Sequence, residues 1–126
     1  MKTRKPSVIC DVFDVVVVPF PFSDRTATKW RPALSLTGYD AFGTDADVVT
    51  LAMVTTAKNS AWPFDVWLKD LAEAGLRRDC IVRFKFTTMS FARVEKKLGR
   101  LSRIDQTAVS TALRQLLPQR QARTKI

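Results

Sequence analysis

The side chains that could do chemistry in this sequence are limited by the absence of histidine. Without histidine, the chain cannot form a Ser-His-Asp triad, a Cys-His pair or a histidine-based ribonuclease site. Its four glycines do not cluster into a phosphate-binding loop. Its acidic residues are scattered, whereas a two-metal nuclease needs a convergent set of carboxylates. Any catalysis must therefore use arginine, lysine, threonine, serine or a lone carboxylate.

Cations and aromatic rings are interleaved around one polar loop. Lys29 and Trp30 end this loop, and Phe20 and Phe22 lie near its start. Bases stack on rings and phosphates pair with cations, so this pattern suits single-stranded RNA. The two phenylalanines are better explained as core residues, and Trp30 fits either role. The whole chain adds attraction for a polyanion, because 21 Lys and Arg against 12 Asp and Glu give a net charge of +9.

The cysteines do not indicate a metal site, and we expect no metal or other cofactor. Cys10 and Cys80 are the only thiols, and without histidine they cannot complete a four-ligand zinc site. A disulfide between them stays open, but no secretion signal is present, since Asp11 and Asp14 interrupt the apolar stretch after the basic N-terminus. No apolar segment approaches membrane-spanning length. We therefore expect a reduced, cytoplasmic protein without membrane contact.

The length and composition predict one domain. A chain of 126 residues with 46% hydrophobic content can bury a single core, and smaller pieces could not. We expect a basic arm over residues 1–10, a folded unit over 11–117 and a basic tail over 118–126.

The pattern within the folded unit is mainly β. Runs of apolar and β-branched residues, separated by Gly and Pro, predict strands over 11–18, 33–36, 47–55, 64–68, 80–86 and 91–98. A short helical stretch over 69–74 should end at Gly75, a typical C-cap. Closely spaced short strands of this kind predict a small barrel.

One longer helix is predicted after the strands. Ser102 and Asp105 have the spacing of a capping box, and Pro118 ends the pattern. The apolar side chains that we expect on its packed face are Ile104, Ala108, Ala112, Leu113 and Leu116. The predicted fold is thus a barrel covered by one C-terminal helix.

Five sequence blocks lie in a fixed order between residues 11 and 117. The first joins Asp-Val-Val-Val-Val-Pro-Phe-Pro-Phe at 14–22 to Lys-Trp-Arg-Pro-Ala-Leu at 29–34. The others are Val-Thr-Thr at 54–56, Ala-Gly-Leu at 74–76, Val-Arg at 82–83 and Gly-Arg-Leu at 99–101. Together they resemble the PemK/MazF toxin family, and five blocks in order are more specific than any one alone.

This resemblance implies a homodimeric SH3-like barrel of the CcdB/MazF/PemK type. It also implies an endoribonuclease that cleaves single-stranded RNA and is neutralised by a small antitoxin. Given the charge of the chain, we expect that antitoxin to be acidic. Carried over by position, the catalytic residues are Arg31 and Thr55. An arginine has a pKa above about 12, so we expect Arg31 to stabilise charge on the phosphate first and to act as a general acid only second.

The remaining site residues are assigned to RNA binding. They are Lys29, Trp30, Thr56, Arg83 and Lys85. Thr56 is also the alternative to Thr55, since neighbouring strand residues point to opposite faces and only one can enter the site.

Two departures from the family pattern stand out. Phe13 occupies the place of the usual Gly before Asp14, and Lys85 replaces the acid of the Arg-x-Asp found in some members, which also use a histidine. The runner-up function is therefore a non-catalytic protein of the same fold, either a gyrase poison or a nucleic-acid-binding module. Trp62 and Trp67 are interpreted as barrel packing or a dimer contact.

Overall fold

The computed structural model describes residues 9–19, 29–43, 45–56 and 61–117. Predictions for most of the basic arm, for the loop over 20–28 and for the basic tail lie outside this part of the chain. The elements in chain order are β1 (Asp14–Pro19), β2 (Trp30–Ser35), β3 (Val48–Thr56), β4 (Val66–Trp67), α1 (Leu71–Ala74), β5 (Cys80–Ser90), the 3-10 turn η1 (Phe91–Arg93), β6 (Lys96–Arg100) and α2 (Arg103–Leu116). The mainly β fold with a C-terminal helix is confirmed.

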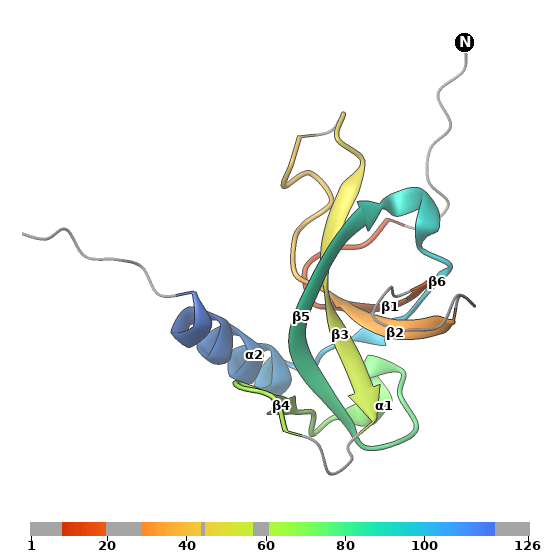
Figure 1. Cartoon of the computed structure of the whole chain (residues 1–126). Coiled ribbons are helices and arrows are strands. Elements are labelled where there is room, and N and C mark those ends of the chain that lie inside the picture. The colour runs from red at the N-terminus through yellow and green to blue at the C-terminus, as the bar shows by residue number, and fades with distance from the viewer. Residues whose placement is uncertain (1–8, 20–28, 44, 57–60, 118–126) are drawn as a thin grey trace, which may run out of the picture.

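The described strands form one antiparallel sheet in the order β4-β5-β3-β2-β1-β6. Its register shifts at Val15/Val16 against β6 and at Ala52/Met53 against β5. Such bulges increase the local twist and bend the strand that carries them. The sheet accordingly curls into a half-barrel, with β3 and β5 curving through the molecule (Figure 1) and α2 packed beside β4.

Both faces of this sheet are buried, which explains the uninterrupted run of valines in β1. Val15 and Leu34 belong to a helix-side core that also contains Val109 and Ala112 of α2. Val16 and Ala33 belong to a second, opposite core. Side chains alternate along a strand, so a strand that lies between two cores reads as continuously apolar.

The predicted strand over 91–98 is wrong as one element. Ser90 ends β5, and its Oγ accepts a hydrogen bond from Ala92 N at 3.0 Å, which caps the turn η1. The chain then enters β6 at Lys96, three residues after η1 ends at Arg93. Local side-chain-to-backbone hydrogen bonds of this kind compete with strand pairing.

The cap of α2 is confirmed, but the predicted packed face is wrong in part. Ser102 Oγ accepts from Asp105 N at 3.2 Å. Ile104 is 61% exposed, whereas the Asp105 side chain is buried. Asp105 can be buried because its carboxylate accepts hydrogen bonds from the backbone N–H groups of Lys69 and Asp70 at 2.9–3.1 Å. Ala108 is also exposed, and Val109 takes the core position.

Both cysteines are free and buried, so the alternative of a disulfide does not hold in this structure. Cys10 lies in the opposite core and Cys80 in the helix-side core. Burial raises the pKa of Cys10 to about 11 and also raises the pKa of Cys80. The thiols are therefore protonated at neutral pH. Within the described ranges, no helix is long and apolar enough to cross a membrane.

Candidate functional site

Arg31 and Thr55 lie on the same face of the sheet. Along β2, Ala33 belongs to the opposite core, and along β3, Leu51 belongs to it while Met53 packs against it. Successive residues alternate between faces. Arg31 is two positions from Ala33, and Thr55 is two positions from Met53, so both point to this face. Each is half-buried near the end of its strand.

The observed β2–β3 pairing ends two positions before Arg31 and Thr55. β2 and β3 are antiparallel, and Ala33 lies opposite Met53. Continued by two positions along each strand, the same register places position 31 opposite position 55. Side chains that face one another in this way have Cβ atoms about 5 Å apart. A guanidinium and a hydroxyl at this spacing can reach the same phosphate group.

Strand β5, on the other side of β3, adds residues to the same face of the sheet. Thr55 pairs with Ile81, and Met53 pairs with Arg83. Arg83 is only 9% exposed, and its guanidinium binds Asp65 side-on, with Nε donating to Oδ1 at 3.1 Å and Nη2 donating to Oδ2 at 2.8 Å. The hydrogen bond to Asp65 raises the pKa of Arg83. Arg83 is therefore on the face of Arg31 and Thr55, as part of a buried ion pair.

Lys85 lies in a bulge of β5 and contacts an aromatic ring. Met53 pairs with Arg83 but its neighbour Ala52 pairs with Phe86, so Lys85 has no partner on β3. Lys85 Nζ lies 4.4 Å from the centroid of the Trp62 ring. This distance is that of a cation–π contact.

Two predicted RNA contacts lie on the other face. Trp30 alternates with Arg31 and Thr56 alternates with Thr55, so both point to the helix side of the sheet. The pocket beside Trp30 has a volume of about 470 Å³ and is also lined by Val17, Glu95, Lys96 and Leu98. Lys29 is exposed directly before β2. The structure thus gathers Arg31 and Thr55 beside Arg83, and separates Trp30 and Thr56 from them.

The acid of the first sequence block is structural. The Asp14 carboxylate is buried at the start of β1, where Arg100 Nη1 lies 3.0 Å and Lys97 Nζ 3.3 Å from its Oδ1. Val18, at the far end of β1, is the residue that pairs with Arg31. Asp14 therefore ties β1 to β6 at a distance from the candidate site.

Hydrogen-bond donors dominate the chemistry that Arg31 and Thr55 offer. A guanidinium presents a planar fork of N–H groups that matches two phosphate oxygens, and a threonine hydroxyl adds a third donor. Among the residues that the structure describes, no group of three or more Cys, Asp or Glu side chains is placed to hold a metal ion. The arrangement is suited to binding a phosphate and to stabilising negative charge that develops on it.

Solved structures of toxins share this fold. The chain is similar to the Mycobacterium tuberculosis toxin MazF-mt6, with 20% identity over 86% of this chain and 99% of that chain and a TM-score of 0.65. It is also similar to a MazE-MazF complex from Deinococcus radiodurans, with 21% identity, 90% and 100% coverage and a TM-score of 0.65. A third is an endoribonuclease in complex with its cognate antitoxin from a mycobacterial species, with 14% identity, 90% and 99% coverage and a TM-score of 0.66.

These similarities define the fold class as that of the MazF toxins. The family itself is shown by the sequence, because residues 11–117 match the model of the PemK-like, MazF-like toxins of type II toxin-antitoxin systems. The chain belongs to this family of toxins, and the predicted resemblance to the family is confirmed. A comparison with curated proteins gives no match.

Proposed function

We propose that this protein is a metal-independent endoribonuclease that cleaves single-stranded RNA in the cytoplasm. The observation that supports the proposal is that Arg31 of β2 and Thr55 of β3 lie on the same face of the sheet, two positions beyond the paired residues Ala33 and Met53. Family membership supports it, and so does the net charge of +9, which favours a polyanionic substrate.

The reaction is a transesterification within the RNA. The 2′-oxygen of one ribose attacks the adjacent phosphorus and loses its proton, the bond from phosphorus to the 5′-oxygen breaks, and that oxygen takes up a proton. The products are a 2′,3′-cyclic phosphate and a 5′-hydroxyl. Negative charge builds on the phosphoryl oxygens, and the Arg31 fork binds them more strongly in the transition state than in the ground state. The Thr55 hydroxyl donates a further hydrogen bond to a phosphoryl oxygen.

The other assigned residues divide by position. Lys29 and Lys85 are exposed or half-exposed cations that can contact phosphates on either side of the cleaved bond. Arg83 supports the site through its pair with Asp65. Trp30 and Thr56 point away from Arg31, so RNA would reach them only by passing over the end of the sheet.

We infer that the protein works as a homodimer and is silenced by a small acidic antitoxin. The MazE-MazF complex and the mycobacterial endoribonuclease with its cognate antitoxin are the related assemblies that support this partner. An acidic segment that covers Arg31 and Thr55 would compete with the RNA backbone for the Arg31 guanidinium and the Thr55 hydroxyl. We expect this segment to cover the polar loop over residues 23–30 as well, although most of that loop lies outside the described residues.

The test is cleavage of a mixed-sequence RNA by the purified protein in EDTA. We expect fragments that end in a cyclic phosphate. Arg31→Ala should lower the cleavage rate by ~100- to 1,000-fold, the usual effect of losing one transition-state donor. Arg114→Ala, which removes an exposed cation from the last turn of α2, is the matched control and should leave the rate unchanged.

Intact RNA with the unmodified protein would remove the enzymatic proposal. The non-catalytic alternatives would then be separated by whether the protein stalls gyrase or only binds nucleic acid. Equal cleavage by the folded Arg31→Ala protein would instead remove the role given to Arg31.

A further inference from the structure

Two exposed tryptophans flank the buried pair of Arg83 and Asp65. Trp67 is 57% exposed and Trp62 is 41% exposed. Trp67 pairs with Ile81, and Ile81 pairs with Thr55. Paired residues point to the same face of a sheet, so the row that contains Arg31 and Thr55 continues through Ile81 to the Trp67 ring.

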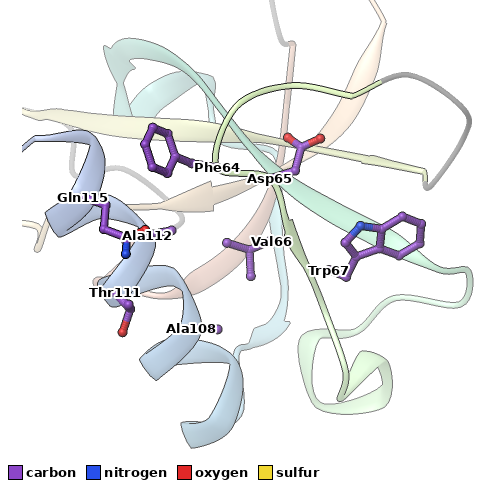
Figure 2. Close-up of a pocket in the computed structure, with 8 residues that line it drawn as sticks. All are labelled: Phe64, Asp65, Val66, Trp67, Ala108, Thr111, Ala112 and Gln115. Carbon is purple, nitrogen blue, oxygen red and sulfur yellow. The ribbon is translucent and has the colours of Figure 1, made fainter.

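The arrangement around β4 places both tryptophans near this row. Figure 2 shows the Asp65 carboxylate and the Trp67 ring directed away from α2, whereas Val66 points toward it. This matches the alternation along the strand, since Val66 belongs to the helix-side core. Neighbouring strands are about 4.8 Å apart, so Thr55 and Trp67, two strands apart, are separated across the sheet by on the order of 10 Å.

Asp65 holds the turn that presents Trp62. Its Oδ2 accepts the backbone N–H of Trp62 at 3.1 Å, and its own N–H donates to the Trp62 carbonyl at 3.1 Å. Both carboxylate oxygens also accept from Arg83. A carboxylate engaged in this way, with a side chain only 12% exposed, is poorly suited to taking a proton from RNA. It is suited to fixing the turn against β5.

Lys85 adds a positive charge at the same place. Its ammonium lies over the Trp62 ring at 4.4 Å from the centroid. Single-stranded RNA is bound by just this combination of chemistry, with bases stacked on aromatic rings and phosphates next to cations. A water-exposed tryptophan ring next to a cation can stack on a base while the cation pairs with a phosphate of the same nucleotide.

We propose that Trp62, Trp67 and Lys85 form a nucleotide subsite for single-stranded RNA on the β4–β5 edge of the site, and that Asp65 is its positioning residue. The subsite takes bases that neighbour the cleaved bond, through stacking on the two rings, and their phosphate, through Lys85. This inference rests on the proposed function, because it assumes that RNA crosses the row containing Arg31 and Thr55.

Binding is measured by fluorescence anisotropy of a short, fluorescein-labelled single-stranded RNA of mixed sequence, in the Arg31→Ala background so that the probe stays intact. Trp62→Ala and Trp67→Ala should each raise Kd by ~5- to 100-fold, the range for loss of one stacked base. Trp62→Phe, which keeps a ring, should retain most of the affinity. Phe42→Ala is the matched control, since Phe42 is a 50% exposed ring in the turn at the opposite end of β2 and β3.

Cleavage by proteins that keep Arg31 separates binding from catalysis. Trp62→Ala and Lys85→Gln should raise KM and leave kcat nearly unchanged, because a subsite binds ground state and transition state alike. Asp65→Asn should raise KM in the same way, and adding Asp65→Asn to Trp62→Ala should raise it little further. Two independent structural losses would not show this lack of additivity.

Each outcome decides between the two proposals. Failure of the Arg31→Ala parent to bind RNA, or of the unmodified protein to cleave it, overturns the proposed function. Normal binding and cleavage with unchanged Kd in Trp62→Ala and Trp67→Ala overturns the subsite alone. Sedimentation of each variant tests the interpretation of the tryptophans as a dimer contact, and a loss of affinity that tracks dissociation of the protein would also overturn the subsite.

Discussion

Thr55 and Thr56 are chemically identical neighbours whose side chains leave the strand in opposite directions. Thr55 lies on the same face as Met53 and Arg31, and Thr56 pairs with Cys80 of the helix-side core. Position within the strand, and not residue type, therefore decides which hydroxyl can meet a phosphate.

We predict that Thr55→Val lowers the cleavage rate by ~100-fold, because it removes one donor to the developing charge. Valine preserves the shape and the strand preference of threonine, so the protein should stay folded. Thr56→Val is the matched control and should cleave normally in the same gel assay. If Thr56→Val lowered the cleavage rate more than Thr55→Val, the site would lie on the helix side of the sheet.

Phe13 is a second residue whose backbone matters more than its chemistry. Its φ is 74°, in the left-handed region, and its N–H and carbonyl are tied to Ser35 O at 2.7 Å and Leu101 N at 3.0 Å. This is the position where the family usually has Gly, which adopts such a φ without strain. Phe13 adopts a backbone conformation that Gly would favour, and its side chain packs on the helix-side core.

Removal of the Phe13 ring should therefore be less harmful with Gly than with Ala. Both variants lose the packing, but Ala keeps a Cβ that is strained at positive φ, so Phe13→Gly should be more stable than Phe13→Ala by about 1 kcal/mol. Urea denaturation of the two proteins measures this difference. Greater stability of Phe13→Ala would mean that the residue leaves the left-handed region.

At the scale of elements, two glycines let α1 approach β6. Gly75 has the predicted C-cap conformation, with φ 76°, and a Cβ there would lie 2.2 Å from Leu98 O. A Cβ on Gly99 would lie 2.4 Å from Glu73 O. These glycines belong to two of the five blocks of the family resemblance, and the contact gives a physical reason for both.

We predict that Gly75→Ala and Gly99→Ala each destabilise the protein by more than about 2 kcal/mol, because backbone must move to admit the methyl group. Gly43→Ala is the control, since Gly43 has φ 94° but no atom within 4 Å of an added Cβ. Gly43→Ala should lower the free energy of unfolding by only about 1 kcal/mol, the cost of placing a Cβ at positive φ. Thermal or urea unfolding compares the three, and equal effects would show that the α1–β6 contact is loose.

At the scale of the whole molecule, charge and site act together. The net charge of +9 attracts polyanions in general, while only cations that touch phosphates release counterions. The slope of log Kd against log salt concentration separates these contributions, because each phosphate neutralised on a single strand changes it by about 0.7.

We predict steeply salt-dependent RNA binding by the inactive Arg31→Ala protein. Adding Lys29→Ala should lower the slope by about 0.7, since Lys29 is exposed beside the site. Adding Arg114→Ala should not change it, although the net charge falls equally. Anisotropy titrations at several salt concentrations provide the measurement. Identical slopes for both variants would mean that Lys29 contributes only to the general field.

Much of the fold is determined by local sequence. Three features depend only on neighbours in the chain and were predictable: the β-branched run of β1, the N-cap at Ser102 and the C-cap at Gly75. Arg31 and Thr55 were proposed from family position, which left Thr56 as the alternative to Thr55.

The tertiary structure decided what depends on distant partners. Pairing of β2 with β3 selects the face of Thr55, and the ion pair of Asp65 with Arg83 joins positions that no local pattern connects. Asp105 occupies a core position that a hydrophobic pattern assigns to apolar residues, because two backbone amides from a distant turn satisfy its carboxylate. Side-chain periodicity reports burial of apolar groups, whereas register and buried polar partners are fixed only when the strands and helices meet.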